Sequence, residues 1–428
     1  MKNFIPVLLS IGLLSSCGGG GSTPTQPDSF SQILSTDFSN AKTYIGSSPY
    51  ASVLVNCIAI TEGADSCSLA TLPTIGQDSL NPSIDDIMDR VVVSHDWMGV
   101  RMRNLLEQMP AEILLLLRSA TAIVIDDDIR PAYFWSATGA IYIDPAYLWL
   151  TNAEKSTINT KQDFRSDFGN DLQFKRRWRY VIGNEYAWQS YSLTGSEERQ
   201  IEDTLIAISW LFFHELAHAN DCMSVSLIGQ LNNSQSFLDN YFTIRDNNQC
   251  VQDQLISSAD LQSQVWKDLA RVLYHGDDST STQRSYTPED VGGEFVVDYA
   301  MDTYSYSTVW EDTAMSFEAV LMKKIFNAER DMAIVPYTEE FDCATSPVKY
   351  GVRGRMGDAD VKLRSQLVAE AMLPEIDFTT FFANLEASEA FPFDHGWCDV
   401  NLSNITQKTS KEQQKQSKNH AENVLDIL

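Results

Sequence analysis

The residues of this sequence that most directly suggest chemistry are His214-Glu215-Leu216-Ala217-His218. Two histidines four residues apart lie on one face of a helix, so both imidazoles can reach one tetrahedral zinc ion. The intervening Glu215 lies close enough to take a proton from a metal-bound water. The pattern therefore predicts a Zn²⁺ site in which His214 and His218 are ligands and Glu215 is the general base.

The residues that precede this motif indicate a buried helix. Residues 206–213 (IAISWLFF) are apolar on nearly every face, which is typical of a helix surrounded by other elements. Two imidazoles and a carboxylate are costly to bury unless they have partners, and a metal ion is such a partner.

A catalytic zinc needs a third protein ligand and an open position for water. The short metzincin pattern fails, because it would need a glycine where Asp221 stands and a histidine where Ser224 stands. The third ligand is then a more distant carboxylate. We expect Glu311, with Asp312 available to hydrogen-bond a ligand, while Glu294 is the competing candidate.

The two segments together resemble the gluzincin branch of zinc metallopeptidases, and in particular the anthrax lethal factor-like group. In that group a tyrosine precedes the ligand glutamate by seven residues, as Tyr304 precedes Glu311, and an E-x-x-A-x-x-F helix follows. The resemblance implies a zincin-like fold in which His214, His218 and Glu311 bind zinc.

By the same resemblance Glu215 would be the general base and Tyr304 would stabilise the oxyanion. Several tyrosines cluster in this segment, and Tyr306 is the alternative to Tyr304. The match covers two short segments, the spacing between them is unusually long, and Met315 stands where the pattern favours glutamate. The substrate class of the group therefore does not transfer.

The remaining elements predict an α+β protein with a long active-site helix and extra helical segments. Strands are expected at residues 122–126 and 139–144, followed by a more polar stretch to about Gly195. The active-site helix is expected to start from a capping box at residues 194–197 and to stop near residues 220–221. We expect further helices at residues 85–119, 291–303, 311–330 and 359–372.

Both ends of the chain are expected to lie outside this domain. Residues 1–16 read as a bacterial lipoprotein signal peptide, because a short basic start and an apolar run lead to Cys17. Residues 17–30 would be the lipidated cysteine and a flexible tether, residues 31–400 the metallopeptidase domain, and residues 401–428 a disordered polar tail. We expect a protein of the bacterial cell envelope that meets the membrane only through the lipidated Cys17.

Export places the other six cysteines in an oxidising compartment, where an even number indicates disulfides. Proximity in the sequence favours the three pairs Cys57–Cys67, Cys222–Cys250 and Cys343–Cys398.

The charge of the chain argues against nucleic-acid binding. Its 31 Lys and Arg against 58 Asp and Glu give a formal charge of −27, which phosphate backbones repel. Peptide or protein substrates remain the expected partners. The sequence thus predicts a lipid-anchored, zinc-dependent metallopeptidase, and leaves two alternatives: a non-catalytic surface lipoprotein on a zincin scaffold, and a zinc amidase that acts on cell-wall material.

Overall fold

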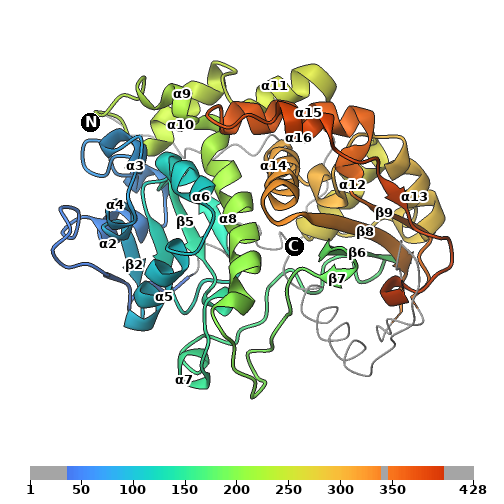
Figure 1. Cartoon of the computed structure of the whole chain (residues 1–428), viewed down its shortest axis with the longest axis horizontal. Helices are drawn as coiled ribbons and strands as arrows, with labels where there is room; N and C mark the ends of the chain where they lie inside the picture. The colour runs from blue at the N-terminus through green and yellow to red at the C-terminus, as the bar shows by residue number, and fades with distance from the viewer. Residues whose placement is uncertain (1–35, 339–345, 400–428) are drawn as a thin grey trace, which may run out of the picture.

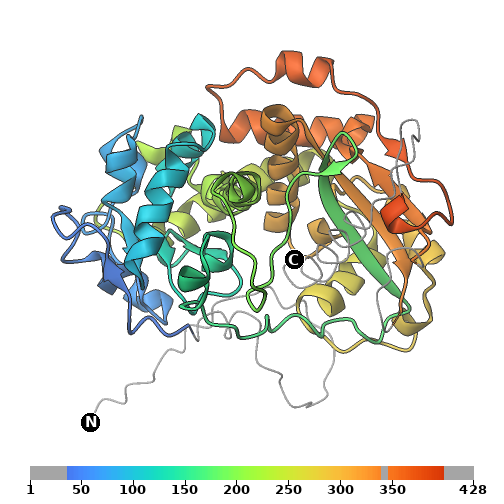
Figure 2. The same ribbon diagram turned by 60° about the horizontal axis from the view of Figure 1, so that its bottom comes forward.

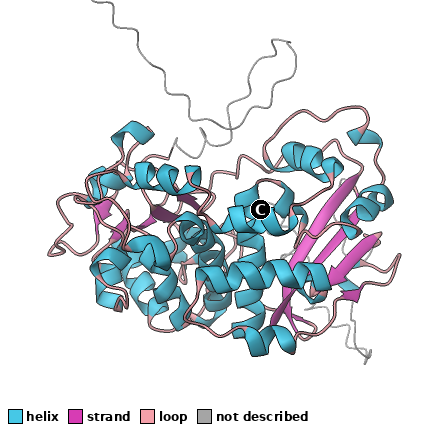
Figure 3. Cartoon of the chain, turned by 90° about the horizontal axis from the view of Figure 1, so that it is seen from above, coloured by secondary structure: helices cyan, strands magenta, loops and turns pink. Residues whose placement is uncertain are grey.

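The structure, a computed structural model, describes residues 36–338 and 346–399, and a long helix runs through the middle of it. This helix, α8 (Glu202–Cys222), is buried along most of its length, as its apolar sequence predicts. One five-stranded sheet lies on each side of it, and Figure 3 shows the two sheets at opposite ends with helices between them. The predicted mixture of helices and strands is confirmed.

The first sheet has the strand order β1-β2-β3-β5-β4. Its three inner strands are parallel and fully buried, which suits their short, continuous apolar runs. The two edge strands are antiparallel to their neighbours. The strands are β1 (Lys42–Thr43), β2 (Val91–Val93), β3 (Ile123–Ile125), β4 (Tyr133–Trp135) and β5 (Ala140–Ile143). The predicted strands at residues 122–126 and 139–144 are β3 and β5.

Short helices surround this sheet, and they correct the prediction for residues 85–119. That segment is not purely helical, because β2 lies between two of its helices and pairs with β3. The helices of this half are α2 (Leu54–Ile58), α3 (Ile75–Asp78), α4 (Ile84–Met88), α5 (Asp96–Leu106), α6 (Ala111–Leu116) and α7 (Asn152–Lys155).

The second sheet is antiparallel throughout, with the order β10-β9-β8-β6-β7. Its strands are β6 (Phe174–Ile182), β7 (Glu185–Tyr186), β8 (Ala328–Pro336), β9 (Tyr350–Arg353) and β10 (Glu389–Ala390). This sheet was not predicted, because β6 lies in the stretch of sequence that was expected to be polar. The helix expected at residues 311–330 ends earlier, because Asn327 adopts a left-handed conformation (φ 51°) and turns the chain into β8.

The helices that follow α8 in the chain are α9 (Val225–Ile228), α10 (Phe237–Asp246), α11 (Val251–Ala259), α12 (Gln264–Tyr274), α13 (Pro288–Val296), α14 (Val309–Phe326), α15 (Ala359–Met372) and α16 (Thr379–Ala383). Of these, α9 and α10 lie over the first half of the molecule, whereas the later ones lie beside α8 and around the second sheet (Figure 1). The helix predicted at residues 359–372 is confirmed as α15. The one predicted at residues 291–303 is displaced, since Thr287 caps α13 and its helix stops at Val296.

The start of α8 also differs from the prediction. The capping box expected at residues 194–197 is not formed, and the helix begins at Glu202 without a side-chain cap. The preceding segment is fixed to other parts of the chain instead, because the backbone N–H of Arg199 donates to the carbonyl of Leu150 at 2.8 Å.

Two of the three predicted disulfides are present, Cys57–Cys67 and Cys222–Cys250. Cys343 of the third pair lies outside the described residues, as do the predicted signal peptide, the tether and the polar tail. Within residues 36–338 and 346–399, none of the helices combines the length and the apolar character needed to cross a membrane.

Candidate metal centre

The candidate site lies where α8 and α14 pack against each other. Figure 2 looks almost along the axis of α8, with the first half of the chain on one side and α14 on the other. His214 and His218 lie one turn apart on α8, and Glu311 lies in the first turn of α14. The hydroxyl of Thr308 caps α14 by accepting the N–H of Glu311, which fixes the backbone of this residue.

The geometry of these three residues fits a tetrahedral zinc ion. Oε2 of Glu311 lies 3.1 Å from Nε2 of His214 and 3.5 Å from Nε2 of His218. A tetrahedral zinc with ligands at about 2.0–2.1 Å separates those ligands by roughly 3.3 Å. Oε2 of Glu311 is buried and receives no hydrogen bond, so a cation between the three atoms would supply its missing partner. In the part of the chain that the structure describes, this is the one cluster of three or more His, Cys, Asp or Glu side chains with metal-ligand spacing.

Electrostatics at the site also favour a cation. Burial lowers the pKa of His214, but the neighbouring carboxylates of Glu311 and Glu318 outweigh this effect and raise the pKa well above its ordinary value. Burial raises the pKa of Glu311, and the neighbouring imidazoles outweigh that effect, holding this pKa far below its usual range. The carboxylates therefore attract positive charge, which a metal ion or a proton on the imidazole can provide.

Glu215, the predicted base, stands between the two histidines in the sequence of α8, and its carboxylate contacts the first sheet. It is 5% exposed, and the backbone N–H of Phe134 on β4 donates to its carboxylate. Burial raises the pKa of Glu215 above its ordinary value, although the imidazoles and the Phe134 N–H act in the opposite direction. A carboxylate with a raised pKa is better suited to accept a proton near neutral pH.

Tyr304 lies on the other side of the cluster. Its hydroxyl donates to Oε1 of Glu311 at 3.1 Å, and its ring lies 6.2 Å from the ring of His214. Burial and the charge of Glu311 raise the pKa of Tyr304 well above its ordinary value, while the guanidinium of Arg165 lowers it. The phenol therefore keeps its proton and can act as a hydrogen-bond donor.

Three other side chains considered from the sequence lie apart from the cluster. Glu294 is exposed on α13, where its carboxylate accepts a hydrogen bond from Ser263. The hydroxyl of Tyr306 is buried and donates to Asp298 at 3.0 Å. Asp312 forms a buried ion pair with Arg364.

The expectation that Asp312 supports a metal ligand is therefore wrong, and a residue that was not considered contacts His214 instead. Glu318, also on α14, lies with Oε2 2.9 Å from Nδ1 of His214. Glu311 and Glu318 are seven residues apart, which is two helical turns, so both lie on the face of α14 that packs against α8. This spacing was the signal available in the sequence.

The end of α8 that follows His218 is firmly anchored. The disulfide Cys222–Cys250 links it to the start of α11, and the carboxylate of Asp221 accepts the N–H of Gln252 at 2.8 Å. The side chain of Asn220 donates to carbonyls on α6 and α8. The turn of α8 that carries His218 is thus held in place by α11 on one side and by α6 on another.

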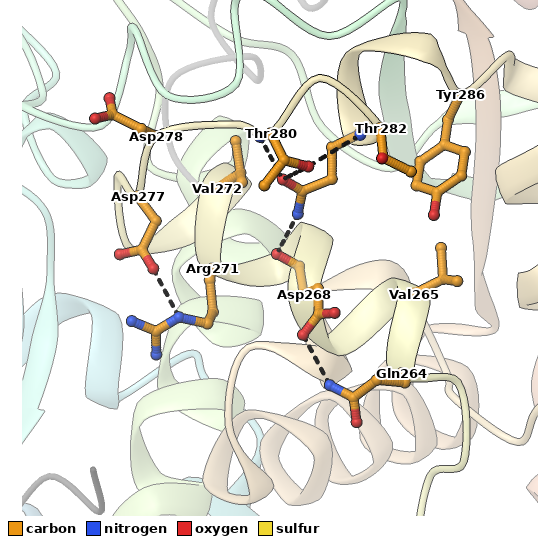
Figure 4. A pocket seen from close by; sticks show the side chains of 11 residues that line it. Gln264, Val265, Asp268, Arg271, Val272, Asp277, Asp278, Thr280, Thr282 and Tyr286 are labelled. Atoms are coloured by element: carbon orange, nitrogen blue, oxygen red, sulfur yellow. Dashed lines mark hydrogen bonds and ion pairs between the residues drawn. The ribbon is translucent and has the colours of Figure 1, made fainter. Parts of the chain in front are cut away.

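A separate hollow of about 410 Å³ lies on the surface beside α12 (Figure 4). Its charged side chains are largely satisfied by local partners, as in the pairs Arg271–Asp277 and Gln264–Asp268. His214, His218 and Glu311 are not among its lining residues.

No protein-family model, curated protein or solved structure matches the chain. The site is therefore interpreted from its own geometry.

Proposed function

We propose that this protein is a zinc-dependent metallopeptidase with a zincin-like fold. The observation that carries the proposal is the convergence of His214, His218 and Glu311, whose buried Oε2 atom faces two imidazole nitrogens and receives no hydrogen bond. A zinc ion held by these three residues would polarise the scissile carbonyl and make a water molecule acidic near neutral pH.

The chain's own residues supply the proton transfers and the electrostatic stabilisation. Glu215 accepts a proton from the attacking water and passes it to the leaving amine. When substrate binds, the single hydroxyl proton of Tyr304, which is donated to Glu311 in the free chain, turns instead to the oxygen that becomes negative as the carbonyl carbon turns tetrahedral. Its contact with Glu311 keeps the hydroxyl next to the ligand cluster.

The position of β4 supports a peptide as the substrate. This strand lies at the edge of the first sheet, and the N–H of Phe134 on it points to Glu215. An extended peptide can add to a sheet edge through main-chain hydrogen bonds. A peptide bound along β4 would pass in front of the general base, which favours a peptidase over an amidase of other substrates.

The disulfides Cys57–Cys67 and Cys222–Cys250 support an oxidising compartment, so we place the protein in the bacterial cell envelope, anchored by a lipid at Cys17. Its partners would be peptide or protein substrates.

The test uses the purified zinc-loaded chain and its Glu215→Gln variant with a mixture of unstructured peptides, analysed by mass spectrometry. We expect cleavage by the native chain, loss of cleavage on removal of zinc with a chelator, and no cleavage by Glu215→Gln with its zinc retained. Loss of zinc in this variant would argue against the role assigned to Glu215. Zinc binding without cleavage of any peptide would favour a non-catalytic surface lipoprotein.

A further inference from the structure

A fully buried carboxylate, Glu318, lies behind the ligand His214. Its Oε2 atom lies 2.9 Å from Nδ1 of His214, and its Oε1 atom accepts hydrogen bonds from Tyr180 and Arg330, each at 2.9 Å. With both other donors on Oε1, the Oε2 atom is left to accept the proton of Nδ1. An imidazole that keeps its proton on Nδ1 presents the lone pair of Nε2 to the metal.

Glu318 is in turn held by Arg330, which is 5% exposed on β8. Nη1 of Arg330 donates to Glu318, Nε donates to Asp302 at 2.8 Å, and the guanidinium lies 4.4 Å from the ring centre of Trp178. A planar guanidinium can bridge two carboxylates in fixed directions, whereas a lysine ammonium on a flexible stem cannot hold both in the same way.

The second carboxylate, Asp302, contacts the segment that carries Tyr304. It is 1% exposed, and its Oδ1 atom accepts the backbone N–H of Tyr304 and the hydroxyl of Thr303, each at 3.1 Å. Asp302 thereby caps the short helical turn that carries Tyr304. Arg330 is therefore connected through one carboxylate to His214 and through the other to Tyr304.

We propose that Glu318, Arg330 and Asp302 form a positioning relay that sets both the ring of His214 and the hydroxyl of Tyr304. None of the three is a metal ligand, and each acts through the residue that it holds. The inference rests on the proposed zinc site and adds to it the residues that orient the site. It also explains why two carboxylates and an arginine are buried together, since such a group is costly to bury and contributes little stability by itself.

The test measures zinc affinity, by competition with a chromophoric chelator, in the native full chain and in Glu318→Gln and Arg330→Lys. Arg353→Lys is the matched control, because Arg353 is equally buried and pairs with Asp331, the residue next to Arg330, and with Gly183 and Asn184. Thermal unfolding of every variant reports the structural cost of each change. The visible absorption spectrum of the cobalt-substituted protein reports the geometry of the metal ligands. A variant whose replaced residue only stabilises the fold would keep the native spectrum.

We expect zinc binding to weaken about 10- to 100-fold in Glu318→Gln and Arg330→Lys, with an altered cobalt spectrum. Arg353→Lys should lower the unfolding temperature and keep the native zinc affinity and spectrum. Native zinc affinity in Glu318→Gln, or an equally large loss of zinc affinity in Arg353→Lys, would overturn the relay. Neither result would contradict the zinc site itself. A native chain that binds no zinc would overturn both.

Glu318→Gln could fail to fold, and a milder variant then tests the same contact. Tyr180→Phe removes one of the two donors to Oε1 of Glu318 and keeps the ring. We expect a smaller loss of zinc affinity in Tyr180→Phe, and unchanged affinity together with an unchanged cobalt spectrum would overturn the relay.

Discussion

Asp126, at the end of β3, should make the stability of this protein fall as the pH rises. Its side chain is 1% exposed, one of its oxygens accepts the N–H of Asp128, and the other has no hydrogen-bond partner. Burial raises the pKa of Asp126 from its ordinary value of 3.8 to about 7; the N–H of Asp128 opposes this rise, and the charges of neighbouring aspartates add to it. The folded chain therefore holds this proton more tightly than the unfolded chain does.

The sign and size of the effect follow from that difference. The free energy of unfolding falls as the pH rises from near 3.8 through about 7, because the unfolded chain ionises first. One pKa unit corresponds to about 1.4 kcal/mol. Between pH 5 and pH 8 the loss attributable to Asp126 is about 2.5 kcal/mol. An asparagine cannot ionise and can still accept the N–H of Asp128, so Asp126→Asn should avoid this loss.

The assay is urea unfolding, followed by tryptophan fluorescence with the disulfides intact, at pH 5 and at pH 8. Asp126→Asn should gain stability relative to the native chain by about 2.5 kcal/mol more at pH 8 than at pH 5. Asp65→Asn removes the same charge at an exposed position and controls for net charge. A gain that is the same at both pH values would refute the argument that burial alters the ionisation of Asp126.

Two further changes test other parts of the structure. Tyr304→Phe removes the proposed oxyanion donor and keeps the ring beside His214. We expect kcat to fall about 100-fold while the zinc content stays unchanged. An unaltered kcat would exclude this role for Tyr304. Replacing Cys222 and Cys250 by serine opens a loop with a sequence separation of 28. The change should lower the free energy of unfolding, measured with urea, by about 3–4 kcal/mol. A loss below about 1 kcal/mol would contradict that expectation.

The strands that could be predicted from the sequence are those whose short apolar runs are bounded by turn-forming residues. β3 and β5 were predicted on that basis, whereas β2 was hidden, because three valines between helical segments also suit a buried helix. The second sheet was missed for another reason. Its strand β6 carries the charged run at residues 175–179, and Arg179 is buried there with Asp331 on β8 as its ion-pair partner across the sheet. A partner so distant in sequence gives no local signal.

The site was predictable where it depends on local spacing. The positions of His214 and His218 on one helix face follow from their four-residue separation, and the seven-residue separation of Tyr304 from Glu311 brought the second segment into consideration. The buried relay was not predictable in this way. Arg330 and Asp302 lie on different elements from Glu318, and they meet because α14 packs against both β8 and the helical turn at Thr303–Tyr306.

The most direct test of the proposed metal centre is the zinc content of the purified full chain, measured together with Glu311→Gln and Glu294→Gln. We predict about one tightly bound zinc per chain in the native protein and in Glu294→Gln, because Glu294 is exposed and apart from the cluster, and a marked loss in Glu311→Gln. A folded native chain that contains no zinc, and takes up none when it is offered, would contradict the account.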